Sequence, residues 1–175
     1  MSPKRDQQLL LANESASRAF ASLGGFFGRE LPSTGHSEVQ DLESLSAGGG
    51  VGLFGDLDGE VSGRLAVLFE PEPMRMLAGK LGLRGAEEPL RLCSLLLEAA
   101  NIAFSTAGGV LGDAVGVIVF PSVPRFCTRL SDELLGSPSP IDEDVPVAYV
   151  TSAELEADGR TATVRFVWIP SNGVA

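Results

Sequence analysis

A line of polar side chains runs along the apolar segment 94–105, which reads SLLLEAANIAFS. Its members recur at i, i+4, i+7 and i+11 and are Ser94, Glu98, Asn101 and Ser105. At roughly 100° per residue, a helix would place them within about 60° of one another. An acid and an amide then stand one turn apart, no Lys or Arg occurs between positions 92 and 124, and the small neighbours let another surface approach closely. The line predicts a helix face that presents a carboxylate and an amide to a partner protein.

The alternative interpretation of this line is the solvated edge of a buried helix, because polar stripes are typical of surface helices. A solvated edge usually mixes Lys, Arg and Glu, with opposite charges one turn apart. The present line contains no basic residue. Pattern alone leaves both interpretations open.

Other kinds of catalytic site find little support in the sequence. His36, the one histidine, has no cysteine or carboxylate cluster around it, which argues against a histidine triad or a metal cage. The stretch AGGGVGLFGD (47–56) lacks the Lys of a phosphate-binding loop and predicts a turn entering a strand. Cys93 lies among leucines and Cys127 has no base nearby, so neither is expected to act as a nucleophile. We expect no metal site and no cofactor on this chain.

Composition and charge limit the class of protein. The 175 residues suffice for one domain, and 44% of them are hydrophobic, which is enough for a sizeable core. A net charge of −10 argues against nucleic acid or an anionic membrane as partner. The start of the chain lacks the apolar region of a signal peptide, no run of 18 apolar residues occurs, and two cysteines suit a reducing compartment. These features predict a cytoplasmic protein without a membrane span.

The polar line must be positioned by the elements around it. We expect helices at about 5–28, 71–83 and 87–111, and strands at about 50–57, 60–69, 113–120, 144–156 and 160–169. No definite element is predicted for 31–47, and a Pro/Ser/Asp-rich loop is expected at 136–146.

An internal repeat organises these elements. An offset of 88 residues aligns NESASRAFASLGG (13–25) with NIAFSTAGGVLGD (101–113), with five identities in thirteen positions. Each half also contains an alternating strand that ends in proline, at 59–71 and 158–170. We therefore predict an α+β fold in which a pseudo-twofold repeat packs an antiparallel sheet against two long helices. The chain 1–175 is expected to be a single domain made of pseudo-repeats at about 5–86 and 87–170.

The polar line and a later proline resemble the signature of a known protein family. Ser94, Glu98 and Asn101, followed after 22 intervening residues by Pro124, are similar to the signature of the CheC/CheX/FliY family of chemotaxis phosphatases. The resemblance extends along most of the chain, because a tandem repeat is what the CheC/CheX-like fold implies. It implies an enzyme of two-component signalling that hydrolyses the aspartyl phosphate of a CheY-like response regulator.

The resemblance also implies a role for each motif residue. Asn101 would accept a hydrogen bond from the attacking water while its NH2 group faces the phosphoryl oxygens. Glu98 would pair with a lysine of the partner's active site and so dock the helix. Ser94 and Pro124 are expected to pack or to position the helix. Mg²⁺, where needed, would be held by the partner receiver domain, since no carboxylate cluster here resembles a magnesium site.

The first half of the chain carries a degenerate copy of the motif. The 88-residue offset brings Asp6, Leu10 and Asn13 onto the three motif positions, and His36 stands where the proline would be. Leu10 replaces the acid, and Glu14 would point about 100° away from Asn13. We therefore expect one complete site and one relic, as in a single-site CheX-like or CheC-like arrangement.

Rival interpretations remain open at this stage. One is a non-catalytic binding module, such as a flagellar-switch component or a regulator of a CheD-type deamidase. Another is a receiver domain or an unrelated α+β protein whose stripe arises by chance. The intact Glu98 and Asn101 pair favours the enzyme. The expected partners are a phosphorylated CheY-like receiver domain and, further, a CheD-type deamidase, and a homodimer is left open.

Overall fold

The fold centres on one six-stranded antiparallel sheet in the order β1-β5-β6-β3-β2-β4. The computed structural model describes residues 3–28, 30–46, 50–80, 82–83, 88–129, 147–157 and 159–171. The strands are β1 (Ser33–Asp41), β2 (Val51–Leu57), β3 (Gly63–Phe69), β4 (Arg125–Cys127), β5 (Val147–Ala157) and β6 (Arg160–Pro170). The helices are α1 (Pro3–Phe27), α2 (Leu42–Ser46), α3 (Pro71–Lys80) and α4 (Glu88–Val115).

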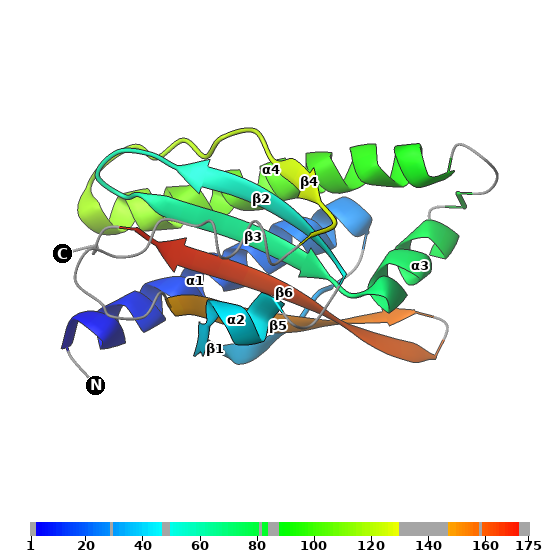
Figure 1. Ribbon diagram of the computed structural model, residues 1–175, viewed down its shortest axis with the longest axis horizontal. Helices are drawn as coiled ribbons and strands as arrows, with labels where there is room; N and C mark the ends of the chain where they lie inside the picture. Colours follow the sequence, from blue (N-terminus) through cyan, green and yellow to red (C-terminus); the bar gives the residue numbers. More distant parts are fainter. Residues whose placement is uncertain are drawn as a thin grey trace.

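The two long helices lie side by side on one face of this sheet, as Figure 1 shows. Alanines on both helices are buried at or near the contact, and their small side chains allow close approach: Ala12, Ala16, Ala19, Ala99, Ala103 and Ala107. Phe166 of β6 packs edge-on against both Phe20 of α1 and Phe104 of α4. The main core therefore lies between the helix pair and the sheet. The short helix α2 packs on the opposite face, over Phe54 and neighbouring strand residues.

The strand order has an internal symmetry. Exchanging β1 with β4, β2 with β5 and β3 with β6 turns the order β1-β5-β6-β3-β2-β4 into its own reverse. The central pair is β3 and β6, the two strands that the sequence relates to each other. This arrangement is what two repeats sharing one sheet would produce. The α+β fold class is confirmed, while the residue limits of the two pseudo-repeats stay a prediction.

Three parts of the secondary structure differ from the sequence prediction. The strand expected at 113–120 is wrong, because α4 continues to Val115 and residues 116–120 belong to no strand, the chain first meeting the sheet at the Pro121–Leu57 bridge before β4 begins at Arg125. The stretch 31–47 is not irregular but holds the edge strand β1 and helix α2. Helix α4 ends at Val115 and is thus longer than the predicted helix, which ends at about 111. The loop predicted at 136–146 lies outside the described residues.

Helix α4 also bears on the question of a membrane. Among the residues that the structure describes, Pro89–Val115 is the one stretch long and apolar enough to cross a bilayer by length and composition. Half of it is buried within the protein, against α1 and the sheet. Core helices commonly have this composition, so the described part of the chain shows no clear membrane span.

Candidate functional site

The polar line lies on the outer face of α4. Ser94, Glu98, Asn101 and Ser105 are all exposed. The opposite face of the same helix is buried in the core, through Leu96, Ala100 and other apolar residues. The helix is thus held by its apolar side, and the carboxylate of Glu98 and the amide of Asn101 remain accessible one turn apart.

Close contacts fix α4 against the sheet below the polar line. Gly55 of β2 faces the ring of Phe104, and a Cβ at this glycine would stand only 2.8 Å from that ring. The missing side chain lets the helix settle directly on β2. Thr106 of α4 and Ser22 of α1 also share a hydrogen bond of 2.9 Å between their hydroxyl oxygens. The part of α4 just after Asn101 is therefore held both by strand β2 and by the neighbouring helix α1.

The supporting motif residues have local roles. The hydroxyl of Ser94 donates a hydrogen bond of 3.0 Å to the carbonyl oxygen of Leu90, one turn earlier in the same helix. Pro124 is buried immediately before β4 begins. These positions are compatible with the packing and positioning roles expected for both residues.

The residues of the degenerate motif lie on α1 in a different environment. Asp6 is exposed, and Leu10 is 73% exposed. Asn13 is only partly accessible, and its Oδ1 atom is buried without a hydrogen-bond partner. An asparagine held in this way presents less of its amide to a partner than the exposed Asn101 does. The two copies of the motif therefore differ in the accessibility of the asparagine as well as in residue type.

The segment that follows α4 returns along the same helix before it enters β4, as the yellow trace in Figure 1 shows. Val117 donates a backbone hydrogen bond of 3.0 Å to the carbonyl of Gly112. Further along, the ring of Pro121 lies over Gly108, where a Cβ would stand 3.0 Å from its Cγ. Segment 117–124 therefore runs antiparallel to the second half of α4.

Asp56 of β2 holds the end of this segment. Its carboxylate accepts hydrogen bonds from Arg64 Nε at 2.7 Å and from a terminal guanidinium nitrogen of Arg125 at 2.9 Å. Partial burial raises the pKa of Asp56, but the two guanidinium groups outweigh that effect and keep the pKa below its ordinary value. The edge strand β4 is therefore tied to β2 by charge as well as by backbone pairing.

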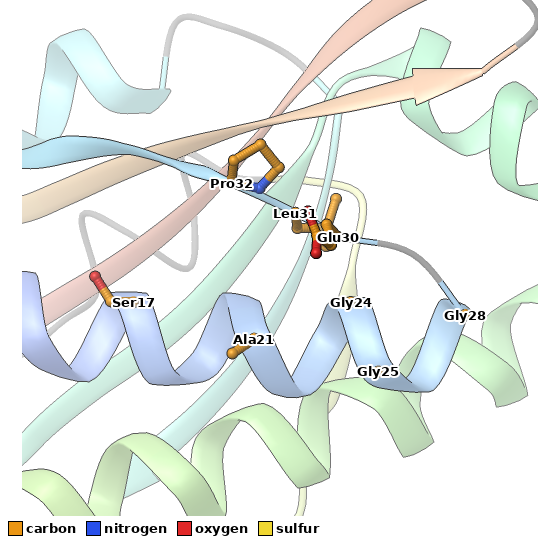
Figure 2. A pocket seen from close by; sticks show the side chains of 8 residues that line it. All are labelled: Ser17, Ala21, Gly24, Gly25, Gly28, Glu30, Leu31 and Pro32. Atoms are coloured by element: carbon orange, nitrogen blue, oxygen red, sulfur yellow. The ribbon is translucent and has the colours of Figure 1, made fainter.

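Surface hollows border the long helices among the described residues. The first, of about 530 Å³, is lined by Gly82, Leu83, Leu90, Arg91, Ser94 and Leu95 and so adjoins the start of the polar line. The second, of about 600 Å³, lies between α1 and the chain leading into β1, and Figure 2 shows its lining. Ser17 and Glu30 are the polar side chains of the second hollow, and it contains none of the motif residues. We regard the first hollow as the one relevant to the site.

The described residues contain no group of three or more His, Cys, Asp and Glu side chains that could hold a metal ion. Cys93 and Cys127 are both free thiols and partly buried.

Comparison with solved structures places this fold among CheC-like proteins. FliY from Thermotoga maritima has a TM-score of 0.66 and 16% identity, covering 97% of this chain and 91% of that one. The FliM middle domain from Vibrio alginolyticus has a TM-score of 0.61 and 18% identity, with coverages of 98% and 96%. A chain of the CheX–CheY–BeF3–Mg²⁺ complex from Borrelia burgdorferi has a TM-score of 0.58 and 20% identity, with coverages of 89% and 95%.

These similarities confirm the resemblance at the level of the fold. The chain has a CheC-like fold, which is shared by structures of CheX, FliY, FliM middle domains and a CheC-like superfamily protein. No family model matches the sequence, and no curated protein matches it. The roles of Glu98, Asn101, Ser94 and Pro124 stay predictions.

Sequence reasoning missed one feature beside the site. Ile118 and Phe120 fall in the strand predicted at 113–120 and Val123 in no predicted element, yet these residues are 82%, 79% and 80% exposed. A usable signal was Gly116 at the end of α4, because a glycine with positive φ after a helix lets the chain reverse direction.

Proposed function

We propose that this chain is a CheC-like phosphatase that hydrolyses the aspartyl phosphate of a response-regulator receiver domain. The observation that carries the proposal is the pair Glu98 and Asn101, exposed one turn apart on a helix whose other face is locked in the core. The fold shared with CheC and CheX structures supports it. The proposal includes membership in the CheC-like family and a cytoplasmic location.

The proposed reaction is attack of water on the phosphorus of an acyl phosphate. A bond forms between the water oxygen and phosphorus, and the bond between phosphorus and the aspartyl oxygen breaks. The bonding pair stays on the aspartate, which leaves as a carboxylate, and the water protons remain with the inorganic phosphate or pass to solvent. Because a carboxylate is a good leaving group, the helper needs mainly to place the water in line.

Asn101 suits this task by its chemistry. Its Oδ1 atom accepts a hydrogen bond from the water, and its NH2 group donates to the phosphoryl oxygens without bringing negative charge. A carboxylate at this position would repel the phosphoryl group. In this proposal Glu98 pairs with a lysine of the receiver, and Mg²⁺ is held by the receiver's own carboxylates.

The partner class rests on the structural likeness as well as the motif. One similar structure is that of CheX in complex with CheY, BeF3 and Mg²⁺. We propose that a CheY-like receiver domain docks on α4 of the present chain in its phosphorylated, Mg²⁺-bound state. A CheD-type deamidase remains a further candidate partner.

A second candidate function is a non-catalytic switch component. It is favoured by the similarity to FliM middle domains, whose TM-scores of 0.61 are as high as the 0.58 and 0.59 of CheX and CheC-like structures. In that case α4 would bind a partner without promoting hydrolysis.

The two candidates differ in the decay of phosphorylated receivers. All receiver domains of the source organism are phosphorylated with acetyl phosphate and Mg²⁺, and loss of the phosphoryl group is followed with and without this protein. The phosphatase proposal expects faster decay for at least one receiver. Binding of a receiver without faster decay would replace it by the non-catalytic candidate.

A further inference from the structure

Three large apolar side chains project into solvent from the segment that follows α4. Ile118, Phe120 and Val123, here called the apolar strip, are 82%, 79% and 80% exposed. Between them Val119 is buried, so inward and outward positions alternate. Single exposed hydrophobic residues are ordinary, but three within six residues form an apolar patch, and such patches mark sites of contact with other proteins.

The apolar strip is continuous with the polar line of α4. Gly108 stands seven residues after Asn101, and Gly112 stands seven after Ser105, so both glycines lie two turns further along the same helix face. Segment 117–121 covers these two glycines. The polar line therefore ends where the strip begins, and the two together form one surface.

The strip also approaches the proposed catalytic turn. Because the segment runs antiparallel to α4, successive residues move back toward the start of the helix: Val117 meets Gly112, and Pro121 meets Gly108. The carbonyl of Ser122 and the ring of Phe104 both border Gly55. Val123 and Pro124 continue in this direction, toward the turn that carries Asn101.

The segment is fixed rather than loosely draped. Ser122 donates its backbone N–H to the carbonyl of Asp56 at 2.8 Å, and its hydroxyl accepts the N–H of Asp56 at 2.9 Å. Pro121 also forms a β-bridge with Leu57. A strip held in this way is preorganised, so binding to it loses little conformational entropy.

A second copy of this chain is a poor occupant for the strip. The net charge of −10 makes two copies repel. Three side chains also supply much less than the roughly 800 Å² per partner of a standard stable interface. A small apolar contact suits a transient encounter in which another part of the same surface contributes charge recognition.

We propose that the apolar strip is the second half of the receiver-docking surface and accepts an apolar rim beside the receiver's phosphorylation site. This inference rests on the proposed function. Glu98 and Asn101 supply the polar contacts, and Ile118, Phe120 and Val123 orient the receiver along α4. They are positioning residues and take no part in the chemical step.

The test compares Phe120→Ser with Leu10→Ser in the full-length protein. Leu10 is a matched control because it is 73% exposed on α1, within the degenerate motif. Binding is measured against a receiver carrying beryllium trifluoride and Mg²⁺, and hydrolysis is measured with the phosphorylated receiver over a concentration series. Phe120→Ser is expected to raise Kd and KM by about 10-fold, the scale of one buried anchor at an interface, with kcat nearly unchanged. Leu10→Ser is expected to leave all three values within about twofold.

The outcomes separate this inference from the proposed function. If the wild type is active and Phe120→Ser leaves Kd and KM unchanged, the apolar strip is not a receiver contact, and the proposed phosphatase function stands. If the wild type binds a receiver without speeding hydrolysis and Phe120→Ser weakens that binding, the phosphatase function is overturned. The apolar strip is then still supported as a receiver contact. A wild type that binds no receiver overturns both. A wild type that sediments as a dimer and becomes a monomer in Phe120→Ser overturns the strip as a receiver contact, because a second copy then occupies it.

Discussion

Asp56 on β2 and Ser122 on the segment after α4 exchange two hydrogen bonds, one through each backbone N–H. The Asp56 side chain meanwhile binds Arg64 and Arg125. A single residue thus connects strands β2, β3 and β4 and fixes the chain that returns along α4. The proposed docking surface consequently depends on the edge of the sheet as well as on the helix.

The Asp56 carboxylate is expected to make stability depend on acid pH. Its pKa is lowered in the folded protein, so its contribution is present above the unfolded value of about 4 and is lost as the pH falls through the folded pKa. Asp56→Asn is expected to lower the free energy of unfolding at pH 7 by about 1–3 kcal/mol, because Arg64 and Arg125 lose their charged acceptor. Urea unfolding at pH 7 and pH 3 measures this effect.

The difference between wild type and Asp56→Asn is expected to shrink at pH 3. The control is Asp58→Asn, at an exposed position just after β2, which is expected to change stability by less than about 0.5 kcal/mol. An equal difference at both pH values would contradict the proposed role of the Asp56 charge.

Gly112 is expected to be needed for the path of the returning segment. A Cβ at this position would collide with the carbonyl oxygen of Val117, so Gly112→Ala should destabilise the protein by about 1–3 kcal/mol. Gly109→Ala is the matched control, because Gly109 lies in the same helix with open space around it. That change should be neutral or stabilising by up to about 1 kcal/mol, since alanine favours the helix. Thermal unfolding of both variants checks the prediction, and equal melting temperatures would contradict the close packing.

Glu98 is expected to act in docking. Glu98→Ala should weaken binding to a beryllofluoride-activated receiver by about 1–3 kcal/mol, because the partner's lysine loses its counter-charge. Glu14→Ala provides the control, since Glu14 is also an exposed helix glutamate but lies on α1. Calorimetric titration measures both affinities. Wild-type binding by a Glu98→Ala variant that is nevertheless inactive would assign Glu98 to chemistry instead of docking.

The polar line was predictable because helical periodicity determines which residues share a face. Ser94, Glu98 and Asn101 lie on the exposed side of α4 as their spacing indicated. The apolar strip was not predictable in the same way. The run GVIVF is continuously apolar and rich in β-branched residues, as a buried strand is, and sequence cannot distinguish an extended segment paired in a sheet from one packed along a helix.

The edge strand β1 was missed for a different physical reason. Its sequence, STGHSEVQD, shows almost no alternation of apolar and polar residues. The strand is held in place by its backbone pairing with β5 along one side. The hydrogen bonds come from a partner more than a hundred residues away, and local propensity carries little information about such contacts. The partial burial of Asn13, which distinguishes it from Asn101, likewise depends on tertiary packing.

The central claim is that Asn101 places the attacking water, and it is tested most directly by single-turnover decay of a phosphorylated receiver with Asn101→Ala and Asn13→Ala. Both variants remove one helix asparagine, so thermal unfolding of each serves as the control for folding. At saturating protein, Asn101→Ala is expected to lower the decay rate by about 10²-fold or more, with receiver affinity little changed, while Asn13→Ala keeps nearly the wild-type rate. Decay at the wild-type rate with a folded Asn101→Ala variant, or a comparable loss with Asn13→Ala, would contradict the account.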